Sequence, residues 1–541
     1  MKKIFVSVLL TAGLSVMSGG SVFGAIPQAY WQYQQPFLDA AAANNTDEII
    51  RLGTEISSLF VNAPNDADKA GILYSTYEKM YPAYEKKGNY EKAIACLKAL
   101  IPYGQQLGFS DGVKIAKERI QKIDPMTEVY ALTQNTNTTP YYGMKNEPKS
   151  GIYFGRVQSE TAEPASSQEG IVSFYVECLQ EDIKEYDYLI RPYADGKRVI
   201  HIALNMPQEN DSLKKVLDSS SDSYLQSTMQ YLSSLNCPVL LRIGGEMDVW
   251  TNLADPALFK EAYIKIATIA RNHASNVALL FSPNIVSNWN VEQEQYYPGD
   301  QYVDWVGVSL YYNKYRNASN PTAMEDFEEM YYGNGIYSHP LTALKKIVDC
   351  YGDRKPIIIT EGGAGHHISG SGVDLTGYAQ NRLKEFYTYV NMVYPQVKGA
   401  IYFDADLGES NEYVYALSQN AAVNTTYKNT ISNNKGALST IGATPMAYVK
   451  AEAYQDTLDT ISLYGYCALP SDSGVTVTYT LDDAVIATQT QMPYGCEIQK
   501  NALTQGSHTL TVTFKGGNGY EKIKNFVLTK DASGVVTIKS K

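Results

Sequence analysis

The stretch PVLLRIGGEMDVW, residues 238–250, decides the fold expected of this chain. Its first four residues are apolar and predict a buried strand, and the sequence then passes Arg242 and two glycines to reach Glu246. A carboxylate at the C-terminal end of a buried strand is the usual geometry of an active site on a parallel barrel. The stretch therefore predicts such a barrel, which needs further strands and a partner for Glu246.

Short apolar runs alternate with helical patterns on both sides of this stretch. We count eight runs, at residues 150–156, 171–176, 198–205, 238–242, 277–282, 303–311, 356–361 and 397–404. The helical patterns between them include residues 223–235, 256–273, 341–351 and 378–393. The runs show little alternation of polar and apolar residues, as expected for strands buried on both faces. Eight β/α units predict a (β/α)8 TIM barrel over residues 140–450.

The chain has 541 residues, more than one core usually holds, so we expect a multidomain protein. Residues 26–125 show apolar residues three and four apart and predict an α-helical hairpin domain. Within it, residues 84–97 resemble a tetratricopeptide repeat, with Gly88, Tyr90 and Ala93 at the turn, aromatic and small positions. This domain either docks a protein partner or packs as a helical layer on the domain that follows.

The C-terminal region, residues 455–541, changes to short alternating strands and predicts a small β-sandwich. Residues 505–512, QGSHTLTV, resemble the late strand of bacterial immunoglobulin-like modules. Such a domain either binds polysaccharide or cell wall or acts as a spacer. The polar residues 127–148 are expected to form a linker or the entry loop to the barrel.

The first residues predict export of the protein. Lys2 and Lys3 precede the apolar residues 4–16, and residues 22–24 offer small residues for cleavage, so residues 1–24 are expected to be a signal peptide. We find no later transmembrane stretch and expect a secreted or cell-surface protein. The net charge of −12 disfavours a nucleic-acid partner, which would require a basic face.

Six cysteines are spread along the chain, and no pair has the spacing of a metal site. Cys467 and Cys496 fall in the predicted sandwich and either form a disulfide or remain buried thiols. A metal site at His366, His367 and Asp374 is a further alternative, whereas two solvated histidines in a polar loop are the simpler expectation. We therefore expect no cofactor and no metal.

Glu361 ends the seventh run, as Glu246 ends the fourth. Strands four and seven face each other across an eight-stranded barrel, so their ends place two carboxylates on either side of one bond. Glycoside hydrolysis needs this arrangement, with one carboxyl group as acid and the other as nucleophile or base. A separation of about 5 Å predicts retention of configuration through a covalent intermediate.

Four segments of the barrel resemble glycoside hydrolase family 26, the β-mannanase-type TIM-barrel glycosidases: LRIGGEMDVW, FSPN at 281–284, YPGDQYVDWVGVSLY at 297–311 and PIIITEGG at 356–363. The resemblance implies that Glu246 is the general acid/base and Glu361 the nucleophile. It further implies substrate-cleft roles for Arg242, Trp250, Trp289 and Tyr311, with Tyr311 reaching toward the nucleophile.

Arg242 lies four residues before Glu246, so on a continuous strand both side chains point to one side. A guanidinium lowers the pKa of a neighbouring carboxylate, and a general acid needs a raised pKa, so Arg242 is expected to serve Glu361 or substrate hydroxyls. The chain departs from the family at Gly245, where a histidine usually precedes the acid, and at Asp248 and Val249, which replace Asn-Gly. His366 and His367 are alternative substitutes for that histidine.

The sequence thus predicts a secreted retaining endo-glycosidase acting on a β-linked polysaccharide, with a mannan-type substrate favoured by the resemblance. Xylan, mixed-linkage glucan and bacterial exopolysaccharide would use the same carboxylate pair. The alternative is a non-catalytic cell-surface glycan-binding or scaffold protein with a degenerate barrel. The intact glutamate pair favours the enzyme, while Gly245 and the helical domain keep the alternative open.

Overall fold

The chain forms two compact units, Met1–Gln121 and Lys122–Lys541. The computed structural model describes residues 26–87, 89–123, 127–160, 162–207, 211–285, 293–314, 340–408, 412–468, 474–517 and 521–541. The signal peptide expected at residues 1–24 lies outside these residues, as does Gly88 of the tetratricopeptide resemblance. None of the described helices is both long and apolar enough for a membrane span.

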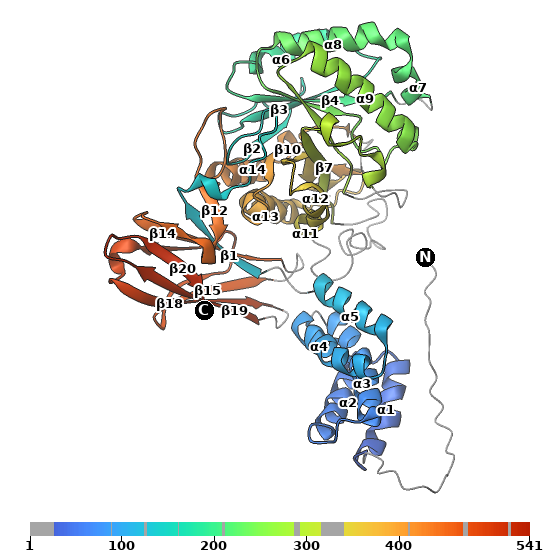
Figure 1. Ribbon diagram of the computed structural model, residues 1–541, viewed down its shortest axis with the longest axis vertical. Coiled ribbons are helices and arrows are strands. Elements are labelled where there is room, and N and C mark those ends of the chain that lie inside the picture. The colour runs from blue at the N-terminus through green and yellow to red at the C-terminus, as the bar shows by residue number, and fades with distance from the viewer. Residues whose placement is uncertain are drawn as a thin grey trace. The chain divides into compact units, whose positions relative to one another are not determined.

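The first unit consists of helices, coloured blue in Figure 1. Its helices are α1 (Tyr30–Ala42), α2 (Thr46–Leu59), α3 (Ala67–Lys86), α4 (Tyr90–Gln106) and α5 (Ser110–Ile123). Polar caps set three of the starts, because Asn45, Asp66 and Asn89 each accept a backbone N–H three residues later. The buried faces of α1 to α4 share one apolar core that includes Phe37 and Leu73.

The predicted eight-stranded barrel is confirmed. Its strands are β2 (Tyr153–Val157), β3 (Ile171–Glu177), β4 (Val199–Asn205), β5 (Val239–Ile243), β6 (Val277–Phe281), β7 (Trp305–Tyr312), β8 (Ile357–Ala364) and β10 (Val397–Tyr402). Every neighbouring pair is parallel, and β10 closes the barrel on β2. Each of the eight predicted runs overlaps one of these strands, and β2, β3, β5, β7 and β8 extend one to three residues beyond the C-terminal end of their runs.

The barrel strands are apolar on both faces, which explains why they show little alternation. One buried cluster takes at least one residue from every strand and fills the interior, with Ile171, Val199, Leu240 and Trp305 among its members. Their neighbours along each strand belong to a second cluster that packs outward against the helices. Positions further along the inward-facing rows, such as Arg242, are therefore directed toward the C-terminal mouth of the barrel.

Helices surround the barrel, as Figure 1 shows for α8 and α9. They are α6 (Asp187–Ile190), α7 (Ser212–Leu217), α8 (Asp222–Ser234), α9 (Pro256–His273), α11 (Pro340–Ala343), α12 (Lys345–Tyr351), α13 (Thr376–Val393) and α14 (Ala421–Asn433). The residues described between β2 and β3, 158–160 and 162–170, form no helix and cross this part of the barrel as a loop. A short extra pair, β9 (His367–Ile368) and β11 (Tyr413–Val414), lies beyond β8 and β10.

Two antiparallel sheets form the rest of the second unit. The four-stranded sheet has the order β12 (Ala447–Lys450), β1 (Thr127–Thr133), β14 (Thr460–Cys467) and β17 (Tyr494–Gln499). The six-stranded sheet has the order β13 (Gln455–Asp456), β20 (Val536–Ser540), β19 (Glu521–Lys530), β18 (Gly506–Gly516), β15 (Val475–Leu481) and β16 (Ala484–Gln489). The segment expected as a linker thus begins with β1, which pairs with β12 and β14.

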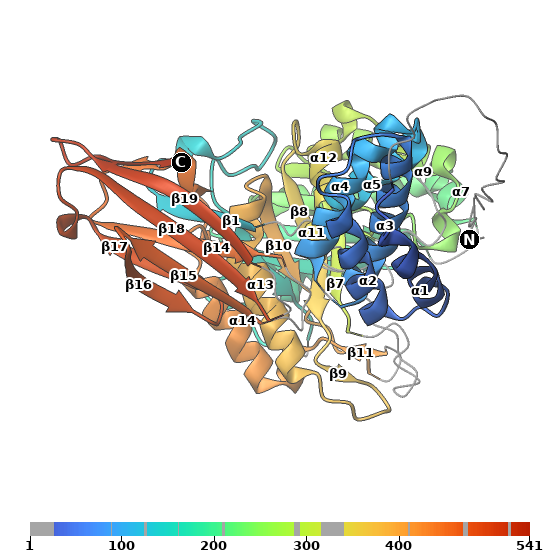
Figure 2. The same ribbon diagram turned by 90° about the horizontal axis from the view of Figure 1, so that it is seen from below.

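The four-stranded sheet contacts the barrel at α13, and these elements lie side by side in Figures 1 and 2. The Tyr389 hydroxyl on α13 accepts the backbone N–H of Tyr494 at 3.0 Å, and the rings of Tyr389 and Tyr466 lie 5.0 Å apart. Cys467 and Cys496 are free and buried. Their strands pair with Cys496 opposite Leu463, a register that does not bring the two sulfurs together.

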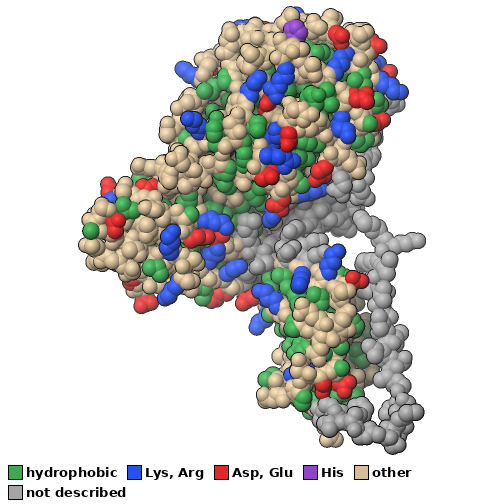
Figure 3. All heavy atoms as spheres, in the orientation of Figure 1, with side chains coloured by type: hydrophobic (Ala, Val, Ile, Leu, Met, Phe, Trp, Pro, Cys, Tyr) green, Lys and Arg blue, Asp and Glu red, His purple; other side chains and the backbone are tan. Residues whose placement is uncertain are grey.

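Charged side chains are mixed on the surface. On the face shown in Figure 3, Lys and Arg side chains alternate with Asp and Glu, and the described residues form no continuous basic patch there. This mixture of charges accompanies a net charge of −12 for the full chain.

Candidate active site

Glu361 enters the barrel mouth through an irregularity in β8. Val308 pairs with Ile359, whereas the next residue, Ser309, pairs with Glu361, so β8 carries one extra residue at this point. The pairing with β10 shifts at the same place. Thr360 points inward, where its hydroxyl lies 2.7 Å from that of Ser282. Regular alternation would then turn Glu361 outward, and the bulge instead aims it into the site.

Three donors surround the Glu361 carboxylate. The Tyr175 hydroxyl and Arg242 Nη1 donate to Oε2 at 2.6 and 2.8 Å, and the Tyr311 hydroxyl donates to Oε1 at 2.5 Å. Burial holds the pKa of both tyrosines well above the ordinary value, so both hydroxyls stay protonated and donate. Charge-assisted hydrogen bonds of this kind stabilise the negative charge of a carboxylate and fix its orientation.

All three nitrogens of the Arg242 guanidinium donate hydrogen bonds that hold the side chain beneath the site. Besides Glu361, it donates from Nε to Ser282 Oγ at 3.2 Å and from Nη2 to Ser309 Oγ at 2.9 Å. The side chain is 1% exposed. Arg242 therefore contacts Glu361, the carboxylate that the sequence argument favoured for it.

Glu246 does not continue the strand of Arg242, contrary to the premise that both lie on one strand. The strand β5 ends at Ile243, and Gly244 and Glu246 both have left-handed backbones, with φ of +56° and +57°. A non-glycine residue in this region costs about 1–2 kcal/mol and persists where its surroundings hold it. The backbone N–H of Glu246 is held by the carbonyl of Ser282 at 2.8 Å.

The carboxyl group of Glu246 is in a different environment from that of Glu361. Burial, followed by the nearby charge of Glu361, raises the pKa of Glu246 to about 7. Hydrogen bonds from Ser309 and Asn284 act in the opposite direction, and Asn284 Nδ2 donates to Oε1 at 2.6 Å. A carboxyl group with a pKa near neutrality is suited to giving and taking a proton.

Gly245, where the chain departs from the family pattern, touches the guanidinium of Arg242. A Cβ at position 245 would lie 2.2 Å from Arg242 Nε and 2.3 Å from its Cζ. Such contacts are far inside van der Waals distance, and the guanidinium is held on three sides. The absence of a side chain at 245 is therefore required by the position that Arg242 occupies.

Gly245→Ala is expected to lower kcat by about 100-fold, the typical cost of displacing a catalytic group by about 1 Å. The methyl group would push Arg242 away from Glu361 and leave the carboxylate misplaced. Steady-state kinetics on a cleaved glycan would measure the loss. Gly377→Ala is the matched control, since a Cβ there meets nothing within 4 Å. Equal activity of both variants and the wild type would contradict the role given to Gly245.

A cavity of about 700 Å³ opens over the two glutamates. Its lining includes Arg242, Tyr311, Trp250, Phe403, Tyr188 and Leu407. Trp250 is 44% exposed and presents its ring to this space, as an aromatic platform for a sugar face requires. Trp289, the other tryptophan expected here, lies outside the described residues.

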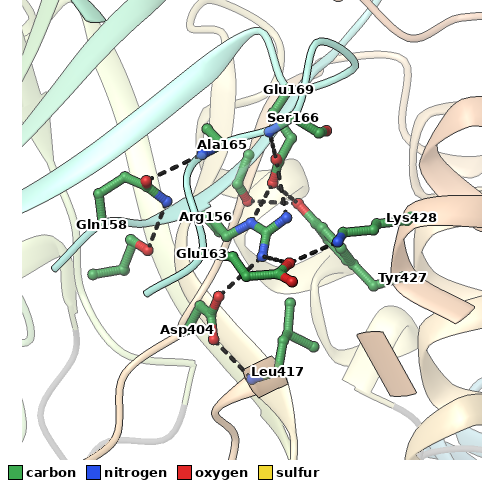
Figure 4. Close-up of polar contacts among 12 residues, drawn as sticks. Arg156, Gln158, Glu163, Ala165, Ser166, Glu169, Asp404, Leu417, Tyr427 and Lys428 are labelled. Carbon is green, nitrogen blue, oxygen red and sulfur yellow. Dashed lines mark hydrogen bonds and ion pairs between the residues drawn. The ribbon is translucent and has the colours of Figure 1, made fainter. Parts of the chain in front are cut away.

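A buried ion-pair network fixes the loop that replaces a helix between β2 and β3 (Figure 4). Arg156 donates to both carboxylate oxygens of Glu169, at 2.8 and 3.1 Å, and to Asp404 at 3.1 Å. The Tyr427 hydroxyl on α14 donates to Glu169 at 2.9 Å. Arg156 and Glu169 are fully buried, so removing Arg156 would leave the charge of Glu169 without its ion-pair partner.

This network holds one wall of the cavity, because residues 158–160 line it. The Gln158 side chain accepts the Ala165 N–H at 3.2 Å and the Tyr193 hydroxyl at 2.7 Å, which closes the loop on itself. Figure 4 shows Gln158 and Ala165 beside the Arg156 cluster. The contact of Arg156 on β2 with Asp404 after β10 therefore fixes the junction of the first and last barrel strands beside this wall of the cavity.

The two histidines proposed as substitutes near the acid lie elsewhere. His366 is buried and its Nε2 lies 3.0 Å from the Ala416 carbonyl oxygen, while His367 pairs with Asp374 and Val414 through the backbone. Neither lines the cavity. The described residues contain no group of three or more His, Cys, Asp or Glu side chains that would hold a metal ion.

Several residues of the site had no role in the sequence argument. Tyr175 lies two residues before the end of β3, Ser309 precedes Tyr311 by two residues on β7, and Phe403 follows β10. Phe403 meets the rings of Tyr175 and Tyr311 edge-on, at centroid distances of 6.1 and 6.0 Å. Position at a strand end is the sequence signal that would have indicated Tyr175 and Phe403.

A match to a known protein family covers the middle of the barrel. Residues 196–341 match the sequence model of glycosyl hydrolase family 26. This segment contains Arg242, Glu246, Asn284 and Tyr311, and it ends before Glu361. No curated protein matches the chain.

The similar solved structures include two β-mannanases and one β-glucuronidase. A Cellulomonas fimi endo-β-1,4-mannanase double mutant is 14% identical, covering 69% of this chain and 94% of its own, with a TM-score of 0.37. A family 26 β-mannanase from Bacteroides ovatus is 18% identical, covering 52% and 88%, with a TM-score of 0.36. A calcium-binding mutant of Bacteroides uniformis β-glucuronidase 2 is 10% identical, covering 74% and 47%, with a TM-score of 0.37. Over residues 196–341 the chain is thus similar to glycosyl hydrolase family 26, which supports a glycoside hydrolase.

Proposed function

We propose that the protein is a retaining glycoside hydrolase that cleaves a β-linked polysaccharide, with Glu361 as nucleophile and Glu246 as general acid/base. The observation that carries this proposal is the contrast between two carboxyl groups lining one cavity. Three donors stabilise the charge of Glu361, while burial and the charge of Glu361 raise the pKa of Glu246 to about 7. Pairs of carboxyl groups with such different surroundings divide the acid and nucleophile roles in glycosidases.

In the first step, a Glu361 oxygen attacks the anomeric carbon and the bond from that carbon to the leaving oxygen breaks. Glu246 gives its proton to that oxygen, so the leaving sugar departs as a neutral alcohol. The product of this step is an ester between Glu361 and the sugar. The Tyr175 and Tyr311 hydroxyls and Arg242 hold the attacking carboxylate in one orientation throughout.

In the second step, water attacks the same carbon, the bond from that carbon to the Glu361 oxygen breaks, and Glu246 accepts a proton from the water. The change of role follows from electrostatics, because the charge of Glu361 is one cause of the raised pKa of Glu246. That charge disappears when the ester forms, so the pKa of Glu246 falls and the group becomes a better base. Two inversions at one carbon give net retention.

The cavity favours a neutral glycan. Among its described lining residues Arg242 is the only basic side chain, and it is committed to Glu361 and two serines. Glu160, Glu246 and Glu361 are acidic members of the lining. A uronic acid would meet negative charge without a free cation. A mannan-type substrate is favoured by the resemblance of the site segments to family 26 and by the neutral character of such a chain.

The remaining parts of the proposal concern location and flanking regions. The N-terminal segment supports export, so we place the protein outside the cell or at its surface. We assign the helical unit as tetratricopeptide-like, where it docks a protein partner or the cell wall. We assign the two sheets as an immunoglobulin-like sandwich, whose contact with α13 through Tyr389 and Tyr494 makes it a support of the barrel.

Incubation with a panel of polysaccharides tests the function. We expect wild type to cleave at least one neutral β-linked glycan among β-mannan, xylan and mixed-linkage β-glucan, and to leave a polyuronate intact. Proton NMR of the first product would show the β-anomer before mutarotation. Binding of glycans without cleavage would instead support the non-catalytic alternative, and an α-anomer as first product would exclude double displacement.

A further inference from the structure

Asp248, two residues after Glu246, is completely buried and holds a second segment of chain. Its Oδ1 accepts the backbone N–H of Asn284 at 2.9 Å, and its Oδ2 accepts Gln293 Nε2 at 3.2 Å. The same Gln293 nitrogen donates to the carbonyl oxygen of Asn284 at 2.6 Å. The Asn284 peptide is therefore gripped on its N–H side by Asp248 and on its carbonyl side by Gln293.

The residue held in this way is the one that contacts Glu246. Asn284 Nδ2 donates to Glu246 Oε1 at 2.6 Å. The neighbouring backbone adds to the grip, since the N–H of Ile285 donates to the carbonyl of Ser309 at 3.1 Å. Asp248 and Glu246 belong to one turn, and Asn284 on the segment after β6 links their side chains.

We propose that Asp248 is a positioning residue for Glu246: by holding Asn284, it keeps an amide N–H on Oε1 and so disfavours that oxygen as the site of the transferable proton. An oxygen that accepts an N–H is the poorer site for a proton, because the hydroxyl oxygen of a carboxyl group is a weaker acceptor than its carbonyl oxygen. The inference rests on the proposed function for the use made of that proton. Asp248 stands where the family pattern has a different residue, so the device belongs to this chain.

Charged and titratable groups face Glu246 from four strands. They are Arg242 on β5, Glu361 on β8, Tyr175 on β3 and Tyr311 on β7. None of them forms a described hydrogen bond with Asn284, so a substitution at Asp248 is expected to leave their positions unchanged. The effect of Asp248 on Glu246 is thereby separable from theirs.

Asp248 acts on Glu246 in two ways that have opposite signs. Through Asn284 it maintains a hydrogen bond that favours the ionised form of Glu246, whereas its own negative charge would disfavour that form. Lys346 lies near enough to offset part of the charge of Asp248, and Tyr296 faces it from the other side. The sign of the change on removing the Asp248 carboxylate therefore distinguishes positioning from direct charge.

Asp248→Asn removes the grip with almost no change in volume. Its amide nitrogen would face the Nε2 of Gln293, so two donors would meet. Rotation of the Gln293 amide would relieve that clash but would place its oxygen against the carbonyl of Asn284. One of the three hydrogen bonds that join residue 248, Asn284 and Gln293 is lost in either case.

The titration of Glu246 is measured by NMR on protein labelled with 13C at the glutamate carboxyl carbon, with Glu246→Gln to assign the signal. Asp248→Asn and Asn284→Ala are each expected to raise the midpoint by about one pKa unit, the scale of one hydrogen bond to a charged group. The double variant is expected to titrate at or slightly below the midpoint of Asn284→Ala alone, because it loses the charge of Asp248 and has no further hydrogen bond to lose. Asp304→Asn is the control, a buried aspartate that accepts the Leu279 N–H and pairs with Arg271 before β7.

An unchanged or lowered midpoint in Asp248→Asn overturns the inference, and so does a double variant that exceeds Asn284→Ala. If Asp248→Asn does not fold, Gln293→Met tests the same grip, because it removes the second hold on Asn284 without changing charge. The readout needs no substrate. A raised midpoint in a protein that cleaves no glycan therefore supports the positioning role while the proposed function fails.

Discussion

Glu361→Gln is expected to lower kcat by about 10⁵-fold, the scale of loss when a covalent nucleophile is removed from a hydrolase. The glutamine amide neither attacks the anomeric carbon nor stabilises the positive charge that develops there. Its effect extends to stability, because Arg242 is 1% exposed and would lose its carboxylate partner. Breaking a buried pair in this way costs about 3–5 kcal/mol. Steady-state kinetics and thermal unfolding of the same preparation would measure the two losses.

Asp304→Asn is the matched control for this variant, since it removes a buried carboxylate near the opposite end of β7. Its activity is expected to equal that of wild type.

A second arm uses Glu361→Ala with added azide, which has room to attack the anomeric carbon and yields a glycosyl azide of inverted configuration. Retention of more than a hundredth of wild-type kcat in Glu361→Gln, without azide, would place the nucleophile elsewhere.

Glu246→Gln is expected to lower kcat/KM on a natural glycan by about 10³-fold, within the usual contribution of a general acid. The loss depends on the leaving group, because an aryl glycoside with an acidic phenol departs without a proton. Such a substrate is expected to lose much less in the first step. Comparing a series of aryl glycosides with an oligosaccharide would measure this dependence.

The pH profile gives an independent signature of Glu246. The acid must be protonated in the first step, so kcat/KM of wild type is expected to fall as pH rises through about 7, the pKa to which burial and Glu361 raise this group. Glu246→Gln is expected to lack this alkaline limb, and Asp304→Asn is expected to keep it. An identical limb in Glu246→Gln would assign the titration to another group.

The barrel was predictable because its strands are apolar on both faces and recur with helices between them. Each strand overlapped an expected run, from Tyr153–Val157 at the start to Val397–Tyr402 at the end. The two glutamates were predictable as strand-end carboxylates. The arrangement of their side chains was not, because it depends on the extra residue in β8 and on the left-handed backbone of Glu246.

Both irregularities break a rule on which sequence reasoning depends. Alternation along β8 selects Thr360 as the inward residue, and only the tertiary pairing with β7 and β10 shows that Glu361 faces inward too. The hydrogen bonds that position Glu246 join Asp248, Asn284 and Gln293 from two loops. Nothing in the sequence around each of these residues indicates that they are in contact. The reason for Gly245 likewise appears only when the guanidinium of Arg242 is seen beneath it.

The position of β1 affects the order in which the chain folds during synthesis. Its residues emerge before the barrel, yet Thr133 bonds to Asp456 across 323 residues and Thr127 contacts Cys467 across 340. Closing so long a loop is slow, and an unpaired strand with apolar residues is prone to association. β1 therefore lacks its partner strands β12 and β14 while the barrel is being synthesised. Completion of the four-stranded sheet is therefore a late event, and the first strand made is among the last to be paired.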